Sequence, residues 1–172
     1  MALIEVVLGD IADEVVDAIV TAANESLLGG GGVDWAVHSA AGPRLAQAGG
    51  AIAPCLPGDA KVTPAFDLDP PVKYVIHTVG PVWDGGAYGE ADTLASCYRR
   101  CLQVADELGV RGIAFPAIAT GVYGFPSALA ARIAVATIKS AQTDVALIRL
   151  VAFDQTAYDL LVEATQRDDL PA

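Results

Sequence analysis

Basic residues are scarce in this chain of 172 residues. Only ten Lys and Arg stand against 21 Asp and Glu, which gives a formal net charge of −11. Proteins that bind a nucleic-acid backbone need clustered cations, so this balance argues against a nucleic-acid polymer as a partner. The charge does not argue against one small phosphorylated ligand, because backbone N–H groups can supply the local positive potential that a phosphate needs.

Long apolar runs are also missing. No run approaches the roughly 20 residues of a membrane-spanning helix, and we find no basic amphipathic stretch suited to a membrane surface. The first five residues lack the basic charge of a signal peptide and lead directly into a predicted strand. We therefore expect no membrane partner and a cytoplasmic location.

Cysteine is limited to Cys55, Cys97 and Cys101. An odd number of widely spread cysteines is not a disulfide framework and indicates a reducing compartment. Cys97 and Cys101 lie four residues apart on a predicted helix, a spacing typical of small side chains in a core. A zinc site needs paired Cys or His with two further ligands, and only His38 and His77 remain. We expect no metal and no cofactor.

The glycines of this chain have an unusual arrangement. Four consecutive glycines, 29–32, come directly before a predicted helix over residues 33–41. Glycine lets the backbone approach a ligand closely, and a helix N-terminus presents unpaired N–H groups, so together they favour a phosphate site. Asn24 and Asp34 flank the run. The alternatives are a flexible turn for the glycines, a turn cap for Asn24 and a helix-stabilising acid for Asp34.

Apolar runs alternate with helical periods along the whole chain, which is typical of an α/β domain in three layers with a largely parallel central sheet. The predicted strands are 3–8, 17–22, 60–63, 74–79, 112–115 and 147–153. The predicted helices are 33–41, a further turn at 44–48, 90–108, a helix that Ser127 caps and that ends near Ser140, and 155–167. Residues 64–71 are predicted as a loop and 168–172 as a frayed tail.

Ligands of such sheets bind beyond the carboxyl ends of the strands. This rule brings five loops to one predicted crevice: 9–11, 24–34, 80–86, 117–125 and 153–154.

The motifs in these segments resemble those of the macrodomain family, in the subgroup that includes bacterial O-acetyl-ADP-ribose deacetylases and mono-ADP-ribosyl hydrolases. The matching segments follow the family's order and cover nearly the whole chain, so the resemblance implies one macrodomain over 1–172 with a mixed, largely parallel sheet. They are Gly-Asp-Ile at 9–11, Asp-Ala-Ile-Val-Thr-Ala-Ala-Asn at 17–24, Leu-Leu-Gly-Gly-Gly-Gly-Val-Asp at 27–34, His-Ser-Ala-Ala-Gly at 38–42, Cys-Leu-Pro-Gly-Asp-Ala at 55–60, Tyr-Val-Ile-His-Thr-Val-Gly-Pro at 74–81 and Phe-Pro-Ala-Ile-Ala-Thr-Gly-Val-Tyr-Gly-Phe-Pro at 115–126.

The resemblance implies an ADP-ribose site. Asp10 would accept a hydrogen bond from the adenine amino group, Phe153 would stack on the ring, and Asn24 and Asp34 would face the distal ribose as catalytic residues. The residues alone allow an alternative interpretation of each: Asp10 as a turn residue and Phe153 as a core residue. The full set of expected ligand-binding residues is Asp10, Ile11, Gly30, Gly31, Gly32, Val33, Ala119, Thr120, Gly121, Val122, Tyr123, Phe125 and Phe153.

The resemblance also implies a hydrolase that removes ADP-ribose from modified proteins, or the acetyl group from O-acetyl-ADP-ribose. We expect an activated water with Asp34 as its base, since no Ser-His-Asp order and no reactive cysteine stands out. His38 and His77 are interpreted as structural, with His38 a satisfied imidazole. The alternative function is a module that binds ADP-ribose without turning it over.

Three positions depart from the family's hydrolase pattern. Thr21 stands where many relatives have Asn, Trp35 where a small residue is usual, and Ala119 where Ser is common. The change at Thr21 removes an amide that could order the catalytic loop, and Trp35 is expected to form a wall beside the reaction centre. Thr21 and Trp35 support the non-catalytic alternative.

Overall fold

A computed structural model describes residues 2–167, so the predicted tail 168–172 lies outside the described residues. One sheet of six strands forms the centre of the molecule, and every neighbouring pair is parallel except β3 and β4. This confirms the predicted mixed, largely parallel sheet. Across the sheet the strands run β1 (Leu3–Leu8), β6 (Leu147–Ala152), β5 (Gly112–Phe115), β2 (Ala18–Ala22), β4 (Tyr74–Thr78) and β3 (Ala60–Pro64).

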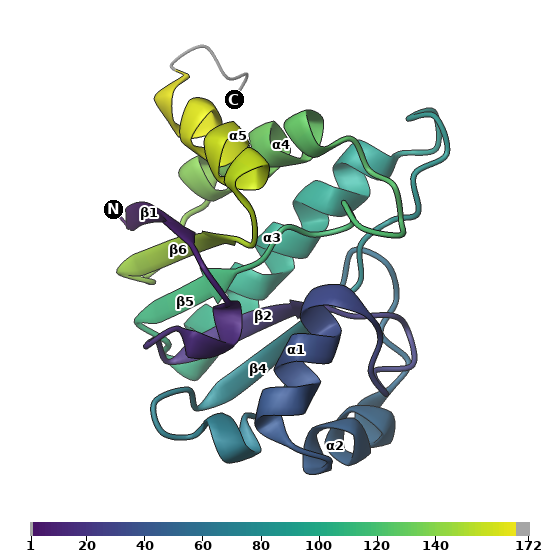
Figure 1. Ribbon diagram of the computed structural model, residues 1–172, viewed down its shortest axis with the longest axis vertical. Helices are drawn as coiled ribbons and strands as arrows, with labels where there is room; N and C mark the ends of the chain where they lie inside the picture. Colours follow the sequence, from purple (N-terminus) through teal and green to yellow (C-terminus); the bar gives the residue numbers. More distant parts are fainter. Residues whose placement is uncertain (1, 168–172) are drawn as a thin grey trace.

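Helices cover both faces of this sheet and complete three layers (Figure 1). One face carries α1 (Gly32–Ala41) and α2 (Arg44–Ile52) with the short 3-10 helices η1 (Ile11–Asp13) and η2 (Phe66–Leu68). The other face carries α3 (Glu90–Leu108), α4 (Ser127–Ser140) and α5 (Gln155–Gln166). The predicted α/β/α layering is therefore confirmed.

Strand β2 lies in the middle of both cores. Ala18, Ile19 and Val20 are completely buried. Ile19 packs into the core under α1, whereas Ala18 and Val20 pack into the core under α3 and α4, because successive side chains of a strand point to opposite faces. This explains the uninterrupted apolar run in the sequence.

Four predicted helix boundaries differ from the structure. Helix α1 begins at Gly32 and α5 ends at Gln166, each one residue from the predicted limit. Helix α2 continues through Gly49 to Ile52, where the prediction stopped at residue 48. Gly49 is required by packing, since a Cβ there would overlap the Leu27 carbonyl oxygen. Helix α4 has Pro126 as its N-cap, and Ser127 is its first residue and makes no cap. In addition, the predicted loop 64–71 contains η2.

The cysteines are core residues, as their spacing predicted. Cys97 and Cys101 are fully buried on α3 beside Leu94 and Tyr98. Burial also raises the pKa of the Cys55 thiol to about 11, which keeps it protonated and unreactive at neutral pH.

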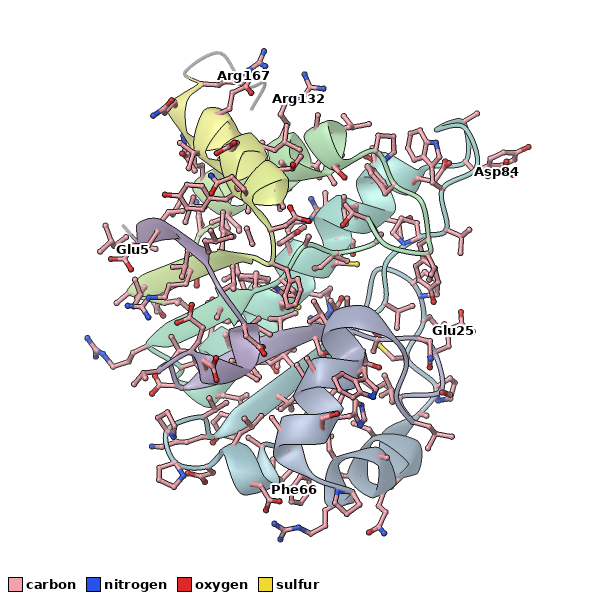
Figure 2. The ribbon with its side chains drawn as sticks, in the orientation of Figure 1. Glu5, Glu25, Phe66, Asp84, Arg132 and Arg167 are labelled. Carbon is pink, nitrogen blue, oxygen red and sulfur yellow. The ribbon has the colours of Figure 1, made fainter. Side chains whose placement is uncertain are left out.

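The loops that follow the parallel strands leave the sheet at a common edge. Glu25 on the β2–α1 loop and Asp84 on the loop before α3 extend on the same side of the molecule (Figure 2). No helix within residues 2–167 is long and apolar enough to cross a membrane.

Candidate functional site

Asp34 is the most deeply buried acid of the candidate site, with an exposed fraction of 2% in the first turn of α1. The Thr21 hydroxyl on β2 donates a 2.8 Å hydrogen bond to its Oδ1 atom, and His38 Nε2 lies 3.5 Å from the same oxygen. Burial raises the pKa of Asp34, while the Thr21 hydrogen bond and the nearby His38 oppose that rise. A carboxylate whose pKa is raised is a stronger base than an ordinary aspartate.

The second oxygen of Asp34 is buried and has no hydrogen-bond partner among the described residues. It faces the glycine run, because a Cβ placed on Gly30 would lie 3.3 Å from Oδ2 and 3.4 Å from Asn24 Nδ2. The structure therefore brings the two predicted catalytic side chains together across Gly30. Any side chain larger than hydrogen at residue 30 would come between them.

Asn24 also shapes the loop that carries it. Its Oδ1 accepts hydrogen bonds from the backbone N–H and the hydroxyl of Ser26, and its Nδ2 donates to the Gly29 carbonyl at 3.0 Å. The structure thus shows the turn-capping role that the sequence left open. One N–H of the amide is not used by these bonds, so Asn24 keeps a donor beside Asp34.

The glycine run forms the entry to α1. Gly29 and Gly32 have φ angles of 115° and 61°, which favour glycine. Gly31 is the N-cap and supplies no side-chain hydrogen bond, so the first N–H groups of α1 stay available to a ligand. Gly30, Gly31 and Gly32 are exposed and Val33 is half-buried. The fully buried Leu27 anchors this loop in a small core of its own.

Asp10 and Phe153 follow two adjacent strands, β1 and β6, whose ends are joined by a hydrogen bond from Gly9 N to the Ala152 carbonyl. Phe153 is 74% exposed, so the alternative that it is a core residue was wrong. Asp10 Oδ1 accepts from Ala12 N at 2.9 Å and caps η1, which confirms a turn role without using the second carboxylate oxygen.

Ile11, the residue after Asp10, has a buried side chain. Its side chain is 3% exposed and packs under α1, so it belongs to the core and only its backbone can reach a ligand. Two ion pairs of Arg149 on β6 stabilise the segment around Ile11: its guanidinium donates to Glu14 at 3.0 Å and to Glu5 at 3.1 Å. These ion pairs were not predicted from the sequence, because the partners of Arg149 are more than 130 residues away from it along the chain.

The second predicted ligand loop, 117–125, is closed by its own backbone. Phe125 N donates to the Ala119 carbonyl at 2.9 Å, and Gly124 N donates to the Gly121 carbonyl at 3.0 Å. Val122 is fully exposed at the tip, Thr120 and Tyr123 are half-buried, and Ala119 is buried with a φ angle of 67°. Phe125 is 1% exposed and therefore supports the loop from within.

Trp83 and Glu90 support this second loop, and neither was identified from the sequence. The centroid of the Trp83 ring lies 4.8 Å from that of the Phe125 ring, and the backbone N–H of Trp83 donates to the Tyr123 carbonyl at 2.8 Å. The buried Glu90 carboxylate accepts three backbone N–H groups, from Asp84, Gly86 and Tyr88. These hydrogen bonds hold the pKa of Glu90 below its usual value, and the bond from Asp84 N–H has the largest effect.

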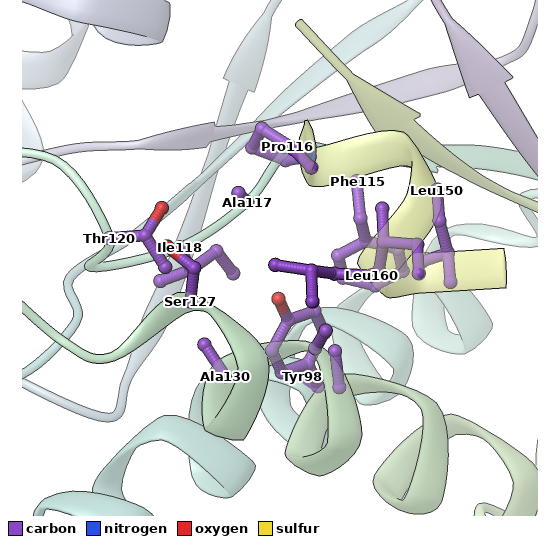
Figure 3. A pocket seen from close by; sticks show the side chains of 14 residues that line it. Tyr98, Phe115, Pro116, Ala117, Ile118, Thr120, Ser127, Ala130, Leu150 and Leu160 are labelled. Carbon is purple, nitrogen blue, oxygen red and sulfur yellow. The ribbon is translucent and has the colours of Figure 1, made fainter. Parts of the chain in front are cut away.

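A cavity of about 40 Å³ lies behind the second loop, between α4 and α5 (Figure 3). Its lining is almost entirely apolar, with Tyr98 at its floor and Pro116, Ala117 and Thr120 along the loop. Of the predicted ligand-binding residues, only Thr120 lines this cavity. This cavity is therefore a feature of the core and not the candidate ligand site.

Comparison with known proteins identifies the family. The family model described as "Macro domain" matches residues 20–134. The chain belongs to the Macro domain family. A Macro domain-containing protein of Chlorobaculum tepidum is 53% identical over 88% of this chain and 87% of its own length. The O-acetyl-ADP-ribose deacetylase of Salmonella typhimurium is 49% identical over 98% of both chains.

Solved macrodomain structures have the same fold. A variant of the Oceanobacillus iheyensis macrodomain, solved with ADPR, superposes with a TM-score of 0.89 at 40% identity and covers 94% of this chain and 90% of its own. The resemblance inferred from the motifs is thus confirmed at the level of the macrodomain family and its fold.

Proposed function

We propose that this macrodomain binds ADP-ribose and hydrolyses a bond at its distal ribose, releasing ADP-ribose from modified proteins or acetate from O-acetyl-ADP-ribose. The observation that carries the proposal is the buried, unpartnered Oδ2 atom of Asp34 beside the glycine loop. An unpaired polar atom at 2% exposure is costly unless a ligand or water completes it.

In the proposed complex, the diphosphate lies between the glycine loop and the loop 119–124, held by backbone N–H groups at the start of α1. Phe153 and Asp10 bind the adenine. Phe153 stacks on the ring, and Asp10 accepts a hydrogen bond from the amino group. This places the distal ribose near Asn24 and Asp34. Salt should weaken such binding only mildly, since few cationic side chains take part.

In the proposed reaction, a water molecule loses a proton to Asp34 Oδ2 as its oxygen attacks the anomeric or acyl carbon. The bond to the departing group breaks, and that group takes up the proton that Asp34 accepted from the water. The raised pKa of Asp34 makes it a stronger base than an ordinary aspartate. Oδ1 accepts the hydrogen bond from Thr21, so Oδ2 is the oxygen that is free to act as the base.

The names of relatives support this class of reaction, because Salmonella proteins that match over 98% of both chains are called O-acetyl-ADP-ribose deacetylase. A module that binds ADP-ribose without turnover is the second candidate. The observation that favours it is Trp35, which is 65% exposed and directly follows Asp34 where the subgroup usually has a small residue.

One experiment separates the two candidates. The protein is incubated with mono-ADP-ribosylated protein and with O-acetyl-ADP-ribose, and the products are followed by mass spectrometry, while calorimetry measures ADP-ribose binding. We expect product from at least one substrate and a dissociation constant near micromolar, about −8 kcal/mol. Binding without product would support the second candidate, and no binding at millimolar ADP-ribose would contradict both.

A further inference from the structure

Thr21 occupies a position from which its hydroxyl can act on one carboxylate. It is completely buried on β2, and its single hydroxyl proton is donated to Asp34 Oδ1 over 2.8 Å. The bond joins residues 13 positions apart, so it links the central sheet to the first turn of α1. A hydrogen bond donated to a carboxylate favours its charged form and limits its rotation.

The bond also determines which oxygen of Asp34 remains free. With Oδ1 held between Thr21 and His38, Oδ2 is directed toward Gly30 and Asn24. Without the hydroxyl, both oxygens would lack a hydrogen bond from the described residues, since the His38 contact at 3.5 Å is too long for one.

We propose that Thr21 is a positioning residue for hydrolysis, whose hydroxyl keeps Asp34 ionised and aims its Oδ2 atom at the reacting water. This inference rests on the proposed function and reverses the expectation that Thr21 weakens the site. The hydroxyl supplies, from the sheet, an anchoring donor for the catalytic carboxylate at the position where many relatives have an amide.

Within residues 2–167, His38 is the ionisable group whose charge acts on Asp34, and His77 is its neighbour. His38 faces Asp34 from the next turn of α1, and His77 on β4 pairs with Thr21 in the sheet and lies behind His38, with 6.4 Å between the ring centroids. His77 is fully buried, its Nε2 is 2.9 Å from the Thr63 hydroxyl, and burial lowers its pKa to about 4. His77 is therefore neutral above pH 5, which leaves His38 as the group that can add positive charge beside Asp34.

The test compares Thr21→Val, which keeps the shape and removes the hydroxyl, with Thr21→Ser, which keeps the hydroxyl. Thr78→Val is the matched control, because Thr78 is also fully buried in the sheet but donates to the Asp59 carbonyl. Protein labelled with ¹³C at the aspartate carboxyl carbons is titrated by NMR, and the Asp34 signal is the one missing from Asp34→Asn. Turnover of the accepted ADP-ribosyl substrate is measured across the same pH range.

We expect Thr21→Val to raise the pKa of Asp34 by about 1 unit or more, which is what one hydrogen bond to a charged group supplies. The acid limb of kcat/KM should move to higher pH by the same amount. At pH values below the pKa of Asp34, kcat should fall on the order of tenfold with KM little changed. Thr21→Ser should recover most of both losses, and Thr78→Val should leave the Asp34 titration in place.

An unchanged Asp34 titration in Thr21→Val, or equal losses in the Val and Ser variants, would overturn the role of the hydroxyl. Should Thr21→Val lose its fold by circular dichroism, Thr21→Ala against Thr21→Ser provides the same comparison. The NMR titration needs no turnover. If Thr21→Val raises the pKa of Asp34 but the parent protein shows no turnover, the role of the Thr21 contact is supported and the proposed hydrolysis is rejected. If the parent turns over substrate but Thr21→Val leaves the Asp34 titration unchanged, the hydrolysis is supported and the role of Thr21 is rejected.

Discussion

The Nε2 atom of His38 lies 3.5 Å from Oδ1 of Asp34, one helical turn earlier on α1. The distance is too long for a firm hydrogen bond, and the nitrogen has no other hydrogen-bond partner among residues 2–167. The expectation that His38 is a satisfied imidazole was therefore wrong. Its effect on Asp34 is electrostatic, since a positive charge on the ring favours the carboxylate form.

Asp34→Ala should lower turnover far more than it weakens ADP-ribose binding. A general base acts in the transition state, so its loss appears in kcat and costs on the order of 10²–10⁴-fold. Rate measurements and calorimetry on the same samples check this. Asp34→Asn is the control, because it keeps the size of the side chain and removes the base. Full activity in both variants would assign the chemistry elsewhere, for example to Asn24 and a phosphate of the substrate.

Asp10→Ala should weaken ADP-ribose binding by roughly 1.5–3 kcal/mol, the range of a hydrogen bond to a charged group. Because Asp10 also caps η1, Asp10→Asn is the matched variant: its carbonyl oxygen can still accept from Ala12 N while the charge is lost. Ribose 5-phosphate, which lacks adenine, should bind all three proteins about equally. Equal losses for both ligands in calorimetry would show that Asp10 supports only the fold.

Glu90→Gln should loosen the loop between β4 and α3 and, through Trp83, the loop 119–125. Since the pKa of Glu90 is lowered in the folded protein, its stabilising effect is present above the unfolded pKa and is lost as pH falls through the folded value. Urea unfolding should thus show the variant less stable at neutral pH, with the difference shrinking in acid. Hydrogen exchange at Asp84, Gly86 and Tyr88 should be faster in the variant, and unchanged exchange would contradict the role.

His77 should contribute to acid unfolding. Its pKa falls from 6.5 in the unfolded chain to about 4 in the fold, because burial disfavours the charged ring. The unfolded state then binds the proton first, so stability present above pH 6.5 is lost as pH falls toward 4, by on the order of 3 kcal/mol. His77→Gln should flatten this part of the stability curve. Parallel curves for the two proteins, measured by urea unfolding, would rule the contribution out.

The fold could be predicted almost completely because its signals are local. The α3 boundaries, Glu90 to Leu108, follow from the apolar period and the glycine after it, and β5 follows from a short apolar run. The errors came from packing at a distance. The predicted helical turn stopped at residue 48, yet α2 continues through Gly49, where Leu27 leaves no room for a side chain.

The site was predictable as a list of loops and not as a set of contacts. Motif order placed Asp34 beside the glycines, but only the fold shows that Thr21, 13 residues earlier, donates to it. Likewise, nothing local links Glu90 and Trp83 to the loop 119–125. Their contacts depend on the parallel order of β5, β2 and β4, which brings these loops to one edge.

Trp35 offers the last prediction, because it decides how the site accepts substrates. Asp34 is buried and the next residue on the helix turns about 100° away, which leaves Trp35 65% exposed. An exposed residue outside the core contributes little to folding, so Trp35→Gly should cost about the 1 kcal/mol of a glycine in a helix, and Trp35→Ala should avoid most of that cost.

Neither variant should change ADP-ribose affinity much, since Trp35 is not among the residues that would hold the diphosphate. Both should change the ratio of kcat/KM for ADP-ribosylated protein to that for O-acetyl-ADP-ribose, because only the larger substrate meets the indole. Competition assays with both substrates in one tube measure this ratio directly. An unchanged ratio with unchanged affinity would show that Trp35 does not border the reaction centre, and the case for a non-catalytic module would then lose the observation that favours it.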